Sequence, residues 1–161
     1  MVESTRPALP DNIVELVNAT RGGLTELLGL RFVSVTYDEI TAEVPVTPHL
    51  FQPYGLVHGG VYTAVIETLA SVGAALYVMA EGRHAVGLEN TTSFLRAVRT
   101  GTLHARAVPL TRGKRTHVWE VLVTDDTGQS VATGRVRILC VAGHTTVAGE
   151  TVSLKTGPLA R

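Results

Sequence analysis

The stretch QPYGLVHGGVYTAVIETLAS, residues 52–71, combines a loop, two glycines and an apolar helix that carries one acid, Glu67. Thr63, Glu67 and Ser71 are spaced by four residues, so they lie on one stripe of that helix. A carboxylate is costly to bury, and two interpretations of Glu67 fit this position. Its side chain either emerges into solvent at an edge of the helix or serves as a functional carboxylate in a half-buried cleft.

Two glycines follow His58 where the helix is expected to begin. Backbone N–H groups at a helix start have no intrahelical acceptor, and the positive end of the helix dipole lies there. Gly59 and Gly60 therefore offer a place for an anion or a developing oxyanion. The alternative is that the glycines only allow close packing and that His58 makes an ordinary hydrogen bond.

The spacing of the two features limits how they can act together. Gly59 and Glu67 are eight residues apart, which is roughly 12 Å along an α-helix and too far for both to hold one reacting carbonyl. Two antiparallel copies of the helix would bring Gly59 of one chain against Glu67 of the other. We therefore expect a dimer with two interfacial sites, each built from both chains.

The elements that position these residues follow from local patterns. Apolar residues at helical spacing predict a short helix from Asp11 to about Asn18, followed by a second partial turn. Residues 31–37 and 40–46 are rich in β-branched and aromatic residues and predict a hairpin. The long helix is expected from about Gly59 to Ala80.

Further strands are expected after this helix, at 84–95, 102–111, 115–124 and 130–141. Consecutive strands with short turns imply antiparallel pairing. One long apolar helix beside about six strands is buried only if the sheet curls around it, so the predicted fold class is α+β.

Composition limits the type of protein. A chain of 161 residues with 45% hydrophobic residues suits one compact domain. Fourteen basic and fourteen acidic residues leave no net field to attract nucleic acid or an anionic membrane. Residues 1–12 contain no apolar stretch of signal-peptide length, and Cys140 alone cannot form an intramolecular disulfide, so we expect a cytoplasmic protein.

One apolar run, residues 61–80, is long enough for a membrane span, but Glu67 lies inside it. A central acid is costly in a bilayer, so a buried helix in a soluble protein is the better interpretation. No metal-ligand spacing is present among the six histidines and Cys140, so no metal is expected.

These motifs resemble the hotdog-fold acyl-CoA thioesterases, particularly the branch with phenylacetate-pathway thioesterases, one class of 4-hydroxybenzoyl-CoA thioesterase and the proofreading thioesterase of enterobactin synthesis. The similarity covers about residues 30–141 and includes VHGG, GLENTTSFLRAVRTG and GKRTHVWEVLVTDDTGQSVATGRV. It is most specific in the spacing of Gln52, His58-Gly59, Glu67 and Ser71. Many relatives have Asp where this chain has Glu67.

The resemblance implies a role for each motif residue. Glu67 would be the catalytic carboxylate, as nucleophile or as the base that activates water. Gly59 would hold the thioester oxygen by its backbone N–H. His58 and Gln52 would position the thioester, and Ser71 would orient a water or the acyl group.

Coenzyme A carries phosphates, and a neutral protein needs a local basic site to bind them. The densest basic cluster is a predicted strand-to-strand turn that resembles the family segment near the CoA nucleotide. It consists of Arg112, Gly113, Lys114, Arg115 and Thr116. The alternative is a solvated hairpin tip. Gly60 would also contact the substrate, Arg96 and Arg99 are weaker candidates, and Asn90 would at most order its strand.

The predicted activity is hydrolysis of an aromatic or medium-chain acyl-CoA, with no cofactor beyond the CoA of the substrate. A hotdog-fold enoyl-thioester hydratase or dehydratase and a non-catalytic acyl-CoA-binding module are the alternatives. The resemblance also implies a homotetramer. The expected organisation is an N-terminal helical segment at 1–29, a hotdog thioesterase domain at 30–141 and a partly disordered C-terminal tail at 142–161.

Overall fold

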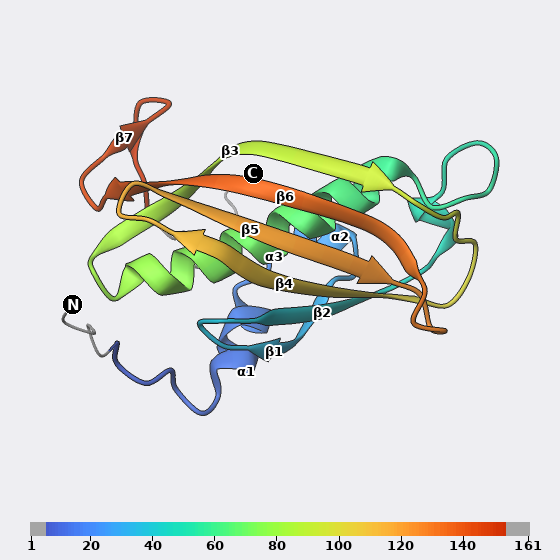
Figure 1. The fold of residues 1–161 in the computed structure, drawn as a ribbon, viewed down its shortest axis with the longest axis horizontal. Coiled ribbons are helices and arrows are strands. Elements are labelled where there is room, and N and C mark those ends of the chain that lie inside the picture. Colours follow the sequence, from blue (N-terminus) through green and yellow to red (C-terminus); the bar gives the residue numbers. More distant parts are fainter. Residues whose placement is uncertain (1–5, 154–161) are drawn as a thin grey trace.

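The computed structural model describes residues 6–153, in which one long helix lies against a curved antiparallel sheet (Figure 1). The helices are α1 (Ile13–Ala19), α2 (Gly23–Leu27), the short 3-10 helix η1 (Pro48–Leu50) and α3 (Gly59–Met79). The strands of the main sheet are β1 (Arg31–Val35), β2 (Ile40–Pro45), β3 (Arg83–Phe94), β4 (Thr102–Arg112), β5 (Thr116–Thr124) and β6 (Ser130–Ala142). Each lies within about two residues of its predicted range, and the α+β prediction is confirmed.

The order of strands across the sheet is β1-β2-β4-β5-β6-β3, with every pair antiparallel. The expectation that consecutive strands pair is wrong for β3 and β4. The hairpin of β1 and β2 occupies the place beside β4, with Ile40 opposite Ala107, so β3 pairs with β6 and forms an edge. The chain therefore crosses from one edge of the sheet to its middle after β3.

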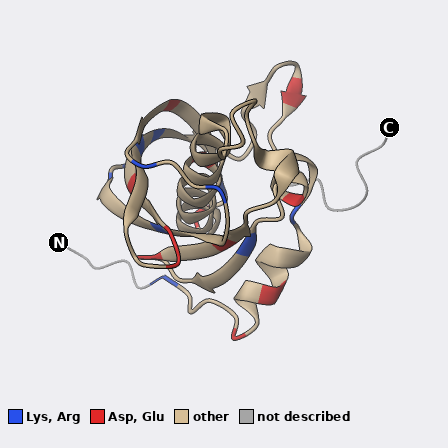
Figure 2. Ribbon diagram, turned by 90° about the vertical axis from the view of Figure 1, so that its right-hand side faces the viewer, with Lys and Arg blue, Asp and Glu red and all other residues tan. Residues whose placement is uncertain are grey.

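Helix α3 lies in the concave face of the sheet, and Figure 2 shows it nearly end-on with strands curving around it. Its apolar side is buried against the sheet; Val65, Ile66 and Leu69 have no exposed surface. Gly73 lies directly under the ring of Trp119, where a Cβ would clash with the ring. The opposite stripe of α3, which carries Thr63, is only half-buried.

By length and hydropathy alone α3 would also suffice to span a membrane. Half of its most apolar stretch is buried in the fold, and the helix contacts each strand from β2 to β6. The core position gives a direct reason for its apolar sequence.

The N-terminal helices lie where the sequence predicts them. The Asn18 side chain of α1 donates to the Phe32 carbonyl at 2.9 Å and accepts from the Phe32 N–H at 3.0 Å, which fastens α1 to β1. After β6, a small hairpin of β7 (Thr146–Val147) and β8 (Glu150–Thr151) was not predicted. Residues 154–161 of the predicted tail lie outside the described residues, and the proposed division into segments stays a prediction.

Candidate active site

Glu67 is half-buried on α3, and two side chains hold its carboxylate. The Ser71 hydroxyl, one helical turn later, donates to Oε1 at 3.2 Å. The Asn90 amide, on β3, donates to Oε2 at 3.0 Å. The acid therefore does not simply extend into solvent from the edge of the helix.

Strand β3 passes close to this carboxylate at Gly87. A Cβ at that position would clash with the Oε1 atom of Glu67. Only glycine leaves room for the carboxylate in this arrangement. The acid is therefore enclosed by its own helix on one side and by the edge strand on the other.

The start of α3 has a specific hydrogen-bond pattern. His58 is the N-cap, and its Nδ1 accepts from the Gly60 N–H at 2.8 Å. An imidazole nitrogen that accepts carries no proton, so neutral His58 has its proton on Nε2. The Gly60 N–H is used within the chain and is not open to a substrate oxygen, whereas the N–H of Gly59 has no acceptor among residues 6–153.

Gly59 and Gln52 line one pocket of about 330 Å³. The Gln52 Oε1 accepts from the Tyr54 N–H at 2.6 Å, which leaves the amide NH₂ to donate. Its other lining residues are Leu56, Val57, Tyr62, Phe94, Leu95, Arg96 and Ala97. The Phe94 ring lies so close to Gly59 that a Cβ there would be 2.8 Å from it. Burial raises the pKa of the neighbouring Tyr62 hydroxyl.

Glu67 does not line this pocket, so within one chain the structure does not bring it together with Gly59 and Gln52. The predicted motif residues form two groups along α3. Gln52, His58 and Gly59 lie at its start, and Glu67 and Ser71 lie beside the edge strand.

A second pocket, of about 370 Å³, lies on the other side of the helix start. His58 and Gly60 border it, and the rest of its lining is mostly apolar. The other lining residues are Leu24, Leu28, His49, Leu50, Phe51, Val61 and Ala64. Leu69 and Gly73, in the second half of α3, line neither of these two pockets, because both positions face the packed core.

The predicted basic turn joins β4 and β5 near the C-terminal end of α3. Arg112 is not free: it forms an ion pair with Asp38 at 2.7 Å and lies over the Tyr77 ring at 4.5 Å from its centroid. The turn itself is closed by a hydrogen bond from the Gly113 N–H to the Thr116 carbonyl at 2.9 Å. Lys114 and Arg115 have exposed side chains.

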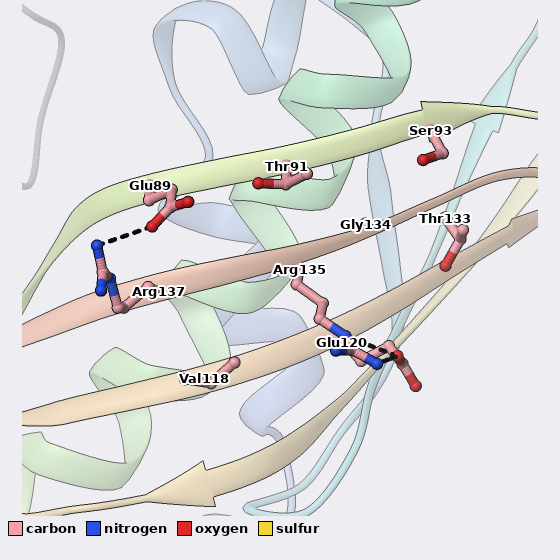
Figure 3. Close-up of a pocket in the computed structure, with 9 residues that line it drawn as sticks. All are labelled: Glu89, Thr91, Ser93, Val118, Glu120, Thr133, Gly134, Arg135 and Arg137. Carbon is pink, nitrogen blue, oxygen red and sulfur yellow. Dashed lines mark hydrogen bonds and ion pairs between the residues drawn. The ribbon is translucent and has the colours of Figure 1, made fainter.

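Another pocket, of about 450 Å³, lies on the outer face of β3, β5 and β6, and Figure 3 shows its lining side chains. Both of its arginines are paired with glutamates, Arg137 with Glu89 at 2.7 Å and Arg135 with Glu120 at 3.1 Å. None of the predicted site residues lines it. Among residues 6–153 no group of three or more His, Cys, Asp or Glu side chains is placed to hold a metal ion.

The sequence interpretation gave no site role to three residues near the predicted site: Asn90 and Gly87 beside the carboxylate, and Phe94 against Gly59. The only signal for Asn90 was a polar residue in a strand expected to follow the helix. Its contact with Glu67 depends on strand placement, which local patterns do not contain.

The family model described as "Thioesterase superfamily" matches residues 54–132. A protein named as an esterase, Rv1847 of Mycobacterium tuberculosis, is 43% identical over 113 residues, which is 69% of this chain and 81% of the relative. The chain belongs to the thioesterase superfamily.

Two further relatives of this superfamily carry the name thioesterase. The proofreading thioesterase EntH of Cronobacter turicensis is 36% identical over 124 residues, covering 76% of this chain and 90% of that protein. A crystal structure of a variant of thioesterase PA1618 from Pseudomonas aeruginosa superposes with a TM-score of 0.79 at 32% identity, covering 86% of this chain and 99% of that one. The predictions of a hotdog fold and of a hydrolytic enzyme are thereby confirmed, since the superfamily is hydrolytic.

Proposed function

We propose that this protein hydrolyses an acyl-CoA thioester in a site shared by two chains, with Glu67 of one chain and Gly59 of the other. The observation that carries this proposal is the hydrogen bonding of the Glu67 carboxylate and of the Gly59 N–H. The Glu67 carboxylate is held by Ser71 and Asn90 on the outward stripe of α3, while the Gly59 N–H has no acceptor among residues 6–153.

The helix start supplies the electrophilic half of the proposed site. The Gly59 N–H, at the positive end of α3, polarises the thioester carbonyl and stabilises the charge that develops on its oxygen. The NH₂ group of Gln52 donates from the same pocket. His58 presents its Nε2–H as a donor toward the leaving sulfur.

Glu67 supplies the other half, by one of two routes. As a base it takes a proton from water, the hydroxide adds to the carbonyl carbon, and collapse of the tetrahedral intermediate expels the CoA thiolate, which takes up a proton. As a nucleophile it attacks the same carbon, expels the thiolate and forms a mixed anhydride that water then cleaves. A single turnover in ¹⁸O-labelled water distinguishes the routes, because cleavage of the anhydride at the glutamyl carbonyl leaves label in the protein.

The dimer is supported by the shape of one chain. Strand β3 is an edge strand of 12 residues, and such an edge presents unpaired backbone groups to a second chain. Leu88 lies on this strand and Leu95 directly follows it, and their side chains are 51% and 54% exposed. Antiparallel pairing of two α3 helices centred near Thr63 places each Glu67 against the Gly59 of the other chain.

Mixed dimers test this arrangement. A chain with Glu67→Ala and a differently tagged chain with Gly59→Pro are each expected to be inactive as homodimers. Their purified heterodimer has one intact site and is expected to show about half the wild-type activity per dimer, measured with a chromogenic thiol reagent. Heterodimers no more active than either homodimer would overturn the shared site.

In this proposal the acyl group and the CoA phosphates bind to different parts of the protein. The mostly apolar pocket between α2 and the start of α3 suits an aromatic or medium-chain acyl group. Lys114 and Arg115 suit the CoA phosphates, because the antiparallel pairing carries the C-terminal end of one α3 past the start of the other. A panel of benzoyl-, hydroxyphenylacetyl-, naphthoyl- and fatty acyl-CoAs, compared by kcat/KM, tests the acyl preference.

The same proposal includes assembly of two dimers into a homotetramer. Light scattering coupled to size exclusion measures the mass of the assembly directly. A stable dimer would remove the tetramer from the proposal and leave the shared site intact.

A further inference from the structure

Asn90 on β3 bonds to both the carboxylate and the backbone of α3. Its Nδ2 donates to Oε2 of Glu67 at 3.0 Å and to the carbonyl of Thr63 at 3.2 Å. An amide NH₂ has two hydrogens, so both are used. One side chain thus ties the acid to the helical turn that precedes it.

A third hydrogen bond, to the amide oxygen, fixes the orientation of the Asn90 side chain. The Thr92 hydroxyl donates to Oδ1 of Asn90 at 2.7 Å. Exchange of the amide oxygen and nitrogen would place an acceptor against the Thr63 carbonyl and against a carboxylate, so only one orientation satisfies all three partners.

The second carboxylate oxygen is restrained as well. Ser71 donates to Oε1 at 3.2 Å, and Gly87 closes the space beside the same atom. A free glutamate side chain samples many rotamers, and these contacts restrict that freedom before substrate binds. Attack on a carbonyl, or removal of a proton from a positioned water, depends on such prior orientation.

From these contacts we infer that Asn90 is a positioning residue for Glu67, and that Thr92 acts through Asn90. Asn90 orients the carboxylate toward the face of α3 where the partner chain would lie, and it leaves each oxygen a lone pair for water or substrate. This inference rests on the proposed function, because it gives Glu67 the reacting carboxylate.

The test compares five variants by kcat, KM and thermal unfolding. Asn90→Ala is expected to lower kcat about 10- to 100-fold with KM within about twofold, since a misplaced reacting group costs rate rather than binding. Thr92→Val removes only the hydroxyl behind Asn90 and is expected to lower kcat by a smaller factor. Thr91→Ala, on the outer face of the same strand, is the matched control and is expected to keep wild-type kinetics.

The pH dependence of Asn90→Asp distinguishes positioning of Glu67 by Asn90 from a purely structural role of Asn90. At pH 8 it is expected to be less active than Asn90→Ala, because it replaces a donor by a second carboxylate facing Glu67. Its activity relative to wild type is expected to rise as the pH falls toward 5, where the substituted carboxyl regains a proton to donate. Equal activities of the two variants at every pH would contradict positioning.

The outcomes separate this inference from the proposed function. If Glu67→Gln keeps full activity, the proposed mechanism fails. If Glu67→Gln is inactive while folded Asn90→Ala and Thr92→Val both keep kcat within about twofold, the mechanism stands and the positioning role is overturned. If Asn90→Ala does not fold, Thr92→Val decides the question, because Thr92 does not touch Glu67.

Discussion

Three consecutive residues at the start of α3 have three different hydrogen-bonding states. His58 caps the helix, Gly60 donates to His58, and the Gly59 N–H between them has no acceptor within residues 6–153. The two glycines suggested two open backbone N–H donors at the helix start. The conformation of the His58 ring leaves only one of them, that of Gly59, open. Of the two glycine N–H groups at this helix start, only that of Gly59 is open to an oxyanion.

A pair of substitutions at Gly59 isolates this N–H. Gly59→Pro removes it and Gly59→Ala keeps it, while both add a Cβ that must displace the Phe94 ring. Proline is accepted at the first residue of a helix, and the φ of −66° and ψ of 138° at His58 suit a following proline. We expect kcat to be about 100- to 1000-fold lower in the proline variant than in the alanine variant.

Both Gly59 variants are measured by thiol release, with thermal unfolding as the check on folding. Equal kcat values in two folded variants would show that the Gly59 N–H does not stabilise the transition state.

At the scale of elements, the edge strand determines more of the site than the sequence suggested. Strand β3 supplies Asn90 and Gly87 to the carboxylate, and Phe94 at its end packs on Gly59. It can reach both groups because it is 12 residues long and packs against α3. The two halves of the motif are therefore joined within one chain by β3, although they do not meet.

The turn between β4 and β5 is expected to contribute to binding of the CoA thioester and not to kcat. Lys114→Glu is expected to raise KM for a CoA thioester about tenfold, corresponding to about 1.4 kcal/mol, with little change in kcat. A thioester of N-acetylcysteamine, which has no phosphates, should show no change in KM. Arg31→Glu, an identical change of charge on β1, is the control.

High ionic strength should reduce the difference between Lys114→Glu and wild type, because salt screens exposed charges. A rise in KM of the same size for both thioesters would exclude a phosphate contact.

The contact between α3 and β5 is close enough to allow only glycine at position 73. Gly73→Ala places a methyl group against the Trp119 ring and is expected to lower the free energy of unfolding by about 1–3 kcal/mol. Trp119→Phe shortens that ring, so the double variant should lose less stability than the sum of the two single variants. Gly22→Ala, which meets no atom within 4 Å, is the control.

Urea unfolding of the four variants measures these differences. Simple additivity of Gly73→Ala and Trp119→Phe would contradict the contact.

At the scale of the whole molecule, a buried histidine is expected to limit stability in acid. His117 is 1% exposed, and its Nδ1 has no hydrogen-bond partner among the described residues. Burial lowers the pKa of His117 below its ordinary value of 6.5, and Arg112, Arg83 and Arg6 lower it further against the opposing effect of Glu81. The unfolded chain therefore binds a proton more readily than the folded one, and stability is lost as the pH falls below 6.5.

Replacement of this histidine tests the assignment. His117→Leu keeps a similar volume without a titrating group, so its unfolding temperature should fall less than that of wild type between pH 7 and pH 5. Parallel curves for the two proteins would place the acid sensitivity elsewhere.

The helices and strands were predictable because each depends on a local pattern. The apolar run that follows Gly59 predicts α3, and the β-branched and aromatic residues of 31–37 and 40–46 predict the hairpin of β1 and β2, as observed. Strand order was not predictable, since it depends on pairings such as Ile40 with Ala107 that are distant in sequence.

The sequence by itself determined that one acid lies on an apolar helix and that it is too far from Gly59 in the same chain, because helical rise per residue is constant. Only the tertiary structure decided which groups hold that acid. Asn90 is 23 residues from Glu67 in the chain and reaches it because β3 takes the sheet edge beside α3. The structure also shows that His58 accepts from the Gly60 N–H and leaves the Gly59 N–H open, a choice that depends on the side-chain conformation of His58 and is not contained in the residue pattern.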